Sequence, residues 1–153
     1  MSKGENKLPD FLAIYQHYQN LKPGPQAELK RAVSPSDLIE IPAFYHVLQG
    51  EKGNQRLQRL LFCLPLITNN EGGDSLGKAL AKANINEKRL FMVIRSEEPN
   101  DLIQLRRLLK QAKPTVDWLS MAKTLYYWND LAKRNLLEDF FYYQITTKTK
   151  ATA

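Results

Sequence analysis

The sequence has few of the residues that metal sites and covalent catalysis require. Among its 153 residues there are one cysteine and two histidines. Cys63 has no second cysteine for an intramolecular disulfide, and its apolar surroundings, LLFCLPLI, predict a buried and unreactive thiol. His17 and His46 belong to no Cys/His cluster with metal-ligand spacing. We therefore expect neither a metal site nor a cofactor.

Long hydrophobic runs are also absent. The longest, at residues 60–67, contains Pro65 and is far shorter than the roughly 18–20 apolar residues that cross a bilayer. The segment MSKGENKLPD at the start of the sequence lacks the apolar stretch of a secretory signal. These absences predict a cytoplasmic protein with no membrane partner.

Sequence motifs for phosphate chemistry are missing as well. The glycine-rich segment GGDSLG at residues 72–77 precedes a predicted helix but lacks the GK[ST] of a P-loop. Glu138 and Asp139 are adjacent, and neighbouring side chains on a helix diverge by about 100°, so a metal would need further carboxylates from elsewhere. We therefore predict that the protein is not an enzyme.

What the sequence does have is apolar residues at helical spacing along almost its whole length, without sustained period-2 alternation. This pattern predicts an all-α fold: a compact or elongated multi-helix bundle, either one body or two small helical lobes sharing a core. We expect a single domain over residues 1–145 and a flexible polar tail over 146–153. The main helices are expected at residues 8–21, 25–33, 41–49, 55–67, 75–83, 87–95, 101–112, 118–128 and 131–144.

Local signals mark several helix starts and part of the core. Asp74 or Ser75, Asn86 and Asp117 are suited to cap the helices that follow them. We expect Phe62, Leu105 and Phe140 to lie in the core. The aromatic residues of the last two helices recur at helical spacing, which favours core packing over base stacking; they are Trp118, Tyr126, Tyr127, Trp128, Phe140 and Phe141.

Positive charge is the other notable property. The chain has a formal net charge of +6, and residues 76–115 contribute +5 of it. In the segment DLIQLRRLLKQA, at residues 101–112, the leucines share one helical face. Arg106, Arg107 and Lys110 fall on an adjacent arc, where we expect them to face solvent. Such a strip suits phosphate binding, but it is equally typical of the solvated face of an amphipathic helix.

Other cations are open to both interpretations. Lys30 and Arg31 end a predicted helix, where they also complement the helix dipole, so a structural explanation suffices. Lys52 lies in a glycine-flanked turn. Lys133 and Arg134 lie on the last helix beside aromatic residues.

Several segments occur in an order that is familiar as a whole. They are IPAFYHVLQ, QRLLFCLPL, SLGKALA, INEKRLFMVIR, DLIQLRRLL, the triplet VDW, YYW and LLEDF. Together they resemble the small subunit of the type I-E CRISPR Cascade surveillance complex, the CasB family. The resemblance extends from about Tyr15 to Phe140. The chain departs from the family at Tyr15 and Tyr18, in a helix where family members often have tryptophan.

The resemblance implies a helical, non-catalytic subunit of an antiviral complex. Its implied partners are the crRNA-binding backbone subunits, the large subunit that recognises the protospacer-adjacent motif and a second copy of itself. It would contact the sugar–phosphate backbone of crRNA and of the target or displaced DNA strands, and so stabilise the R-loop. This fits guided recognition, in which base pairing reads sequence and protein reads backbone and shape.

Carried over by position, the resemblance gives a set of nucleic-acid-binding cations: Arg31, Lys52, Arg95, Arg106, Arg107, Lys110 and Lys133. For Arg106 an alternative is a structural ion pair with Glu138 or Asp139. For the whole protein the alternative is a helical protein–protein adaptor whose basic surface serves solubility only.

Overall fold

Helices make up most of the computed structural model, which describes residues 8–152. In chain order the elements are α1 (Phe11–Gln19), α2 (Pro23–Lys30), η2 (Pro35–Glu40), α3 (Pro42–Leu48), α4 (Gln55–Cys63), η3 (Leu64–Leu66), β1 (Thr68–Asn69), α5 (Leu76–Lys82), α6 (Glu87–Arg95), α7 (Asn100–Ala112), β2 (Thr115–Val116), α8 (Trp118–Tyr126) and α9 (Asp130–Thr152). The predicted all-α class is confirmed. None of the described helices is long and apolar enough to span a bilayer.

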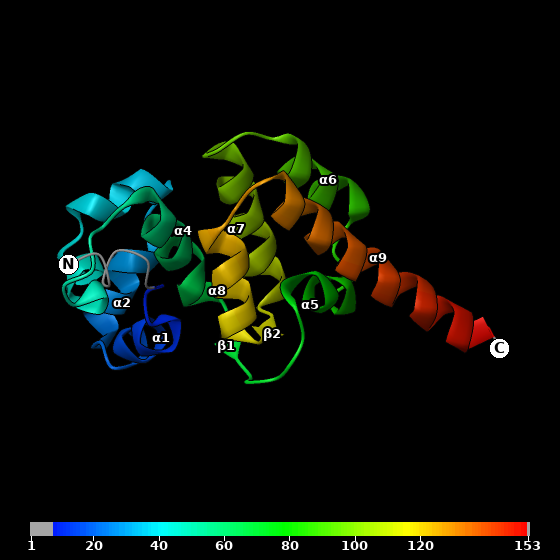
Figure 1. The fold of residues 1–153 in the computed structure, drawn as a ribbon, viewed down its shortest axis with the longest axis horizontal. Helices are drawn as coiled ribbons and strands as arrows, with labels where there is room; N and C mark the ends of the chain where they lie inside the picture. Colours follow the sequence, from blue (N-terminus) through cyan, green and yellow to red (C-terminus); the bar gives the residue numbers. More distant parts are fainter. Residues whose placement is uncertain (1–7, 153) are drawn as a thin grey trace.

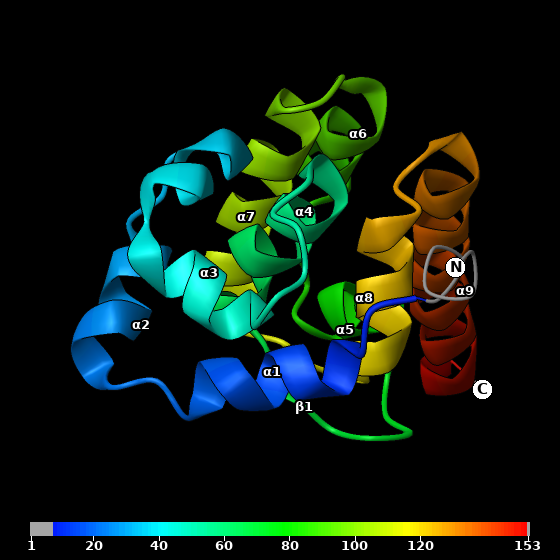
Figure 2. The ribbon, with the colours of Figure 1, turned by 60° about the vertical axis from the view of Figure 1, so that its left-hand side comes forward.

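The helices lie along an elongated body with one continuous core. Helices α1–α4 lie at one end and α5 and α6 at the other, with α7 and α8 between them (Figure 1). Helix α9 extends away from the body toward the C-terminus (Figure 1), and in Figure 2 it runs along the right-hand edge of the view. Buried apolar residues from both ends belong to a single cluster, so the two ends share one core.

The core contains the residues that sequence reasoning placed there. Phe62, Leu105 and Phe140 are fully buried, as predicted. Trp118 is fully buried as well, and its indole Nε1 donates a hydrogen bond to the Phe11 carbonyl at 2.7 Å. One aromatic prediction is wrong, because Tyr127 is 46% exposed at the end of α8, beyond the reach of the core.

Helix ends follow the capping signals with small shifts. The first helix was expected over residues 8–21 but begins at Phe11, because the Asp10 side chain caps it by accepting from Ala13 N at 3.0 Å. Ser75 and Asn86 cap α5 and α6 as predicted. Asp117 occupies the cap position of α8 but its side chain makes no cap hydrogen bond.

A short parallel pairing was not predicted. Strands β1 and β2 have two residues each, with Thr68 opposite Thr115 and Asn69 opposite Val116. Two residues are too few to produce a visible alternation in sequence. The pairing joins the segment after η3 to the connection between α7 and α8, and the Asn69 side chain also accepts from Trp118 N at 2.9 Å.

Gly77 allows α5 and α9 to approach closely. A Cβ atom at this position would clash with the Leu136 carbonyl oxygen and lie 3.0 Å from Phe140 N, both on the α9 backbone. Any larger residue would push the two helices apart. Gly77 therefore sets how closely the projecting helix lies against the body.

The predicted division into a domain and a tail falls within α9. This helix runs from Asp130 to Thr152 without a break at residue 145. The predicted ranges 1–145 and 146–153 also include residues 1–7 and 153, which lie outside the described residues. The mobility of the tail stays a prediction.

Leu105→Ala tests the central position of α7. Because Leu105 is fully buried, its truncation should lower the free energy of unfolding by about 2–5 kcal/mol. The matched control is Leu131→Ala on α9, where the leucine is 62% exposed and the loss should stay below about 0.5 kcal/mol. Urea denaturation followed by circular dichroism measures both, and equal losses would contradict the assigned core.

Candidate nucleic-acid interface

Three hollows border α7, and neighbouring ones share lining residues. The first, of about 410 Å³, lies between α7 and the end of α2 and is lined by Lys30, Arg31, Ala32, Val33, Phe62, Ile103, Arg106, Arg107 and Lys110. The second, of about 450 Å³, shares Lys30 and Lys110 with the first and adds Lys113. The third, of about 150 Å³, shares Arg107 and adds Arg89. We call these three hollows together the α7 groove.

The α7 groove has charge of one sign. Its lining includes seven basic side chains: Lys30, Arg31, Arg89, Arg106, Arg107, Lys110 and Lys113. None of the described residues that line it is an aspartate or glutamate. A concave surface with cations and no carboxylates concentrates positive potential, which attracts polyanions such as the phosphates of a nucleic-acid strand.

The amphipathic pattern of α7 explains part of this arrangement. Leu102, Leu105 and Leu109 are fully buried, whereas Arg107 and Lys110 are exposed, as predicted. Among the described residues, no partner accepts a hydrogen bond from the side chain of Arg107 or forms an ion pair with it. The guanidinium of Arg107 is therefore free to bind a phosphate.

The groove also contains cations that sequence reasoning did not select. Lys30 was explained by the helix dipole alone, and Arg89 and Lys113 were not considered as contacts. Arg89 on α6 donates a hydrogen bond to the side chain of Gln111 on α7. For Arg89 and Lys113 the sequence signal was the excess charge of residues 76–115, whereas Lys30 lies outside that segment. Only the packing of α6 and of the end of α2 against α7 shows which cations share a surface.

Arg106 does not face solvent, contrary to the prediction. Its side chain is buried, with 4% of the residue exposed. Both terminal nitrogens donate to backbone carbonyls at the end of α2, one to Ala32 and the other to Lys30. The predicted alternative, an ion pair with Glu138 or Asp139, is wrong too. On the helical wheel Arg106 borders the apolar face, and the end of α2 packs over that border.

The surroundings of Arg106 are apolar and aromatic. Its guanidinium carbon lies 4.4 Å from the centre of the Phe62 ring. Burial lowers the pKa of Arg106, although arginine stays protonated at physiological pH. Nearby, burial raises the pKa of the Cys63 thiol to about 12. The prediction that this thiol is buried is confirmed, and its low reactivity stays a prediction. Burial likewise raises the pKa of Tyr18 to about 12.

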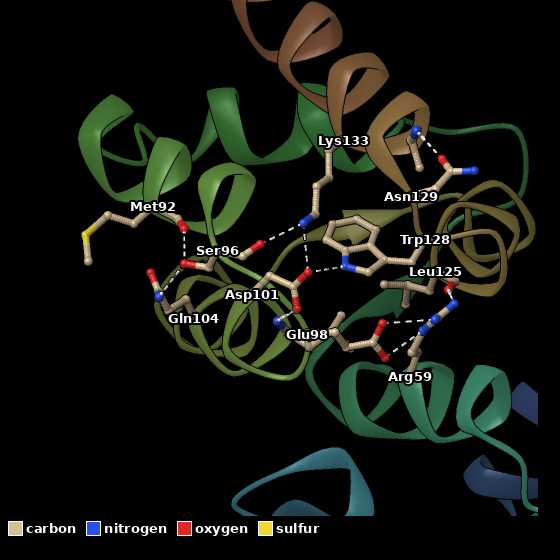
Figure 3. Close-up of polar contacts among 12 residues, drawn as sticks. Arg59, Met92, Ser96, Glu98, Asp101, Gln104, Leu125, Trp128, Asn129 and Lys133 are labelled. Carbon is tan, nitrogen blue, oxygen red and sulfur yellow. Dashed lines mark hydrogen bonds and ion pairs between the residues drawn. The ribbon is translucent and has the colours of Figure 1, made fainter.

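Lys133 is also an interior residue rather than a surface cation. Its Nζ lies 2.9 Å from Asp101 Oδ2 and donates to the Ser96 carbonyl at 2.9 Å (Figure 3). Trp128 Nε1 donates to the same carboxylate oxygen at 2.8 Å. Only 8% of Lys133 and 1% of Asp101 is exposed, so a nucleic-acid strand would have to displace a buried ion pair to reach this ammonium.

A second ion pair lies next to this one. Arg59 binds both carboxylate oxygens of Glu98 at 2.9 Å and donates to the carbonyl of Leu125 at 3.3 Å (Figure 3). It also donates to the carbonyl of Tyr126 at 3.1 Å. Gln55 donates to the same carboxylate at 2.9 Å. The two pairs join α4, the start of α7, the end of α8 and the start of α9. We refer to them as the polar junction.

Two of the predicted contacts lie away from the α7 groove. Arg95 is exposed at the end of α6, with its guanidinium carbon 5.0 Å from the centre of the Phe91 ring. Lys52 is exposed in the turn between α3 and α4. The groove therefore brings together three of the seven predicted residues as exposed cations, namely Arg31, Arg107 and Lys110. Nucleic-acid contact at all of these positions stays a prediction.

The sequence offers few groups for catalysis, and the structure does not gather them. Within residues 8–152, no three His, Cys, Asp or Glu side chains are placed to hold a metal ion. His17 Nδ1 is 2.9 Å from the Val47 carbonyl, which links α1 to α3.

Lys133→Met tests the polar junction. Removing the ammonium leaves the Asp101 carboxylate buried without its cation, which should lower the free energy of unfolding by about 3–5 kcal/mol. Arg134→Met, one residue along α9 at an exposed position, should change it by less than about 0.5 kcal/mol. Adding Asp101→Asn to Lys133→Met should recover part of the loss, and the absence of any recovery would argue against the pair.

Comparison with known proteins places this geometry in a family. Residues 25–141 match the family described as CRISPR-associated protein Cse2. The CRISPR system Cascade subunit CasB of Escherichia coli strain K12 is 39% identical over 147 residues, covering 86% of this chain and 92% of that protein. A chain in the crystal structure of E. coli Cascade bound to a double-stranded DNA target has a TM-score of 0.86 at 38% identity, covering 92% and 99% of the two chains. The predicted resemblance is thus confirmed, and the chain belongs to the CRISPR-associated Cse2 family, which includes the Cascade subunit CasB.

Proposed function

We propose that this protein stabilises the R-loop of a crRNA-guided Cascade complex by binding nucleic-acid backbone in the α7 groove. The observation that carries the proposal is the set of basic side chains along α7 with no carboxylate in the lining. Lysine and arginine contacts to phosphates fix a strand in place without reading its sequence. That is the kind of contact a guided complex needs, because base pairing already supplies the specificity.

A modest binding energy is enough for such a role. Formation of an R-loop exchanges one duplex for another of similar stability, so protein contacts to the strand backbones can decide which state is populated. Arg31, Arg107 and Lys110 are the main contacts in this proposal, and the exposed Arg95 and Lys52 extend it to flanking phosphates. Arg106 and Lys133 are buried, so in this proposal their side chains hold the structure together and do not contact phosphates.

The proposal implies several partners. They are the crRNA-binding backbone subunits, the large subunit that recognises the protospacer-adjacent motif, a second copy of this chain, crRNA, and the target and displaced DNA strands. Similarity to a chain of E. coli Cascade bound to a DNA target supports this set. Membrane surfaces are not among the proposed partners.

Arg107→Ala tests phosphate binding in the groove. Because the variant neutralises one phosphate fewer, it should bind DNA more weakly, by a similar factor for every sequence. It should also make the slope of log K against log salt shallower by roughly 0.7–0.9. Stability should barely change, because alanine is a good helix former at an exposed position. Fluorescence anisotropy at several salt concentrations measures the slope.

The control for this experiment is Arg134→Ala, which removes an exposed arginine of α9 that does not line the groove. Its slope should stay close to that of the parent protein. In an assembled complex, Arg107→Ala should reduce R-loop stability more than crRNA retention. Absence of DNA binding even at low salt would favour the protein–protein adaptor instead.

We also expect no nuclease activity, because the proposed role needs only binding. Purified protein with Mg²⁺ or Mn²⁺ should leave end-labelled DNA and RNA intact on a denaturing gel. Glu138 and Asp139, the adjacent carboxylates of α9, are the residues to vary in any preparation that does cleave. Cleavage that co-purifies with the protein and is lost in Glu138→Ala would overturn the expectation.

A further inference from the structure

The end of α2 presents a difficulty for an anion in the α7 groove. The last carbonyls of a helix have no partners within it, and together with the helix dipole they act as about half a negative charge. In this protein that end lies in the wall of the first hollow, where Lys30 and Arg31 also lie. Uncovered carbonyls would repel a phosphate at the point where these two cations should attract it.

Arg106 donates to carbonyls at this end and just beyond it. One terminal nitrogen donates to Ala32 O, in the segment after α2, and the other to Lys30 O, the last carbonyl of α2, and this second nitrogen is also 3.4 Å from Leu29 O. Its planar fork can serve several acceptors at once, which a lysine ammonium on a flexible stem does less well. The Phe62 ring, 4.4 Å from the guanidinium carbon, supports the plane of the fork from one side.

The charge of Arg106 is not cancelled by an anion. Within the described part of the chain no carboxylate forms an ion pair with it, and its Nε has no hydrogen-bond partner. Its partners are carbonyl dipoles and an aromatic face. The buried positive charge therefore offsets the negative end of α2 and still adds to the positive potential of the groove.

The same hydrogen bonds fix the backbone that carries Arg31. The acceptors flank this residue on both sides, at Lys30 and Ala32, so the guanidinium of Arg106 ties this short segment to α7. Arg31 is the exposed C-cap residue of α2, and it lines the same hollow as Arg107 and Lys110. The position of Arg31 relative to the two α7 cations thus depends on Arg106.

We infer that Arg106 is a positioning residue. It offsets the partial negative charge at the carbonyl end of α2, and it holds Arg31 across from Arg107. Together these two effects make the end of α2 one wall of a phosphate-binding site. This inference rests on the proposed function. Arg106 itself touches no phosphate. It acts through Arg31, whereas Arg107 and Lys110 are held by α7 alone and do not depend on it.

A double-mutant cycle tests this dependence. Arg31→Ala and Arg107→Ala are each made in the full-length parent, in Arg106→Met and in Arg106→Lys. Binding to a labelled single strand and a labelled duplex is measured over a range of salt concentrations. In the parent, Arg31→Ala should make the salt slope shallower by roughly 0.7–0.9. In Arg106→Met, the same change should have almost no further effect, while Arg107→Ala keeps its full effect.

Arg106→Lys separates charge from geometry. It keeps a cation under the groove but loses the fork, so the effect of Arg31→Ala should fall well below its value in the parent. Circular dichroism establishes a temperature at which each variant is folded, and binding is compared there. If Arg106→Met does not fold at any temperature, the lysine variant decides the question.

Two outcomes would overturn the inference. An undiminished effect of Arg31→Ala in the folded Arg106 variants would mean that Arg106 only stabilises the fold. If Arg106→Met itself makes the salt slope shallower by roughly 0.7–0.9 while Arg31→Ala keeps its full effect, Arg106 binds a phosphate directly. Failure of the proposed function looks different, because the parent would then bind DNA without steep salt dependence and Arg107→Ala would change nothing.

Discussion

The arrangement of the later helices depends on the contacts of one buried group, the carboxylate of Asp101. A carboxylate that is 1% exposed is strongly unfavourable unless it is paired and hydrogen-bonded. Its requirements are met by Lys133 of α9 and by Trp128 of the connection before α9, so α7 and the start of α9 have to meet at this point. Gly77 then sets the approach of α9 to α5 further along. The buried carboxylate of Asp101 and the absence of a side chain at Gly77 together determine where α9 lies.

Helix α7 carries its functional cations on a framework of structural charges. Asp101 holds its first turn to α9, and Arg106 holds its middle to the end of α2. Leucines bury the face between them. The Asp101 ion pair and the buried leucines hold α7 in place, so the backbone that carries Arg107 and Lys110 has little freedom to lose on binding. Rigid presentation lowers the entropic cost of association, so each phosphate contact contributes more of its energy to affinity.

The sequence predicted the fold class, most helix positions and the leading core residues, because helical periodicity and capping are local properties. It predicted Arg107 and Lys110 as exposed cations for the same reason. It failed for Arg106 and Lys133, whose partners are backbone carbonyls and a carboxylate at least thirty residues away in the chain. No local pattern distinguishes a cation that will be buried by another element from one that will remain in water. Membership of the family came from an ordered series of motifs rather than from any single residue.

The distribution of charge shows why the groove is distinctive. Elsewhere on the molecule several cations are paired with carboxylates. Asp74 pairs with Lys78 and Lys82, and the hydrogen bond from Lys82 lowers the pKa of that carboxyl. Arg59 and Lys133 are matched in the polar junction. The groove lining has seven basic side chains and no acidic one, while the whole chain has a net charge of +6, so the remainder is close to neutral. The basic character of this protein therefore belongs to one surface. A polyanion that approaches it is drawn to α7 rather than to the molecule at large, and this selectivity follows from where the carboxylates are as much as from where the cations are.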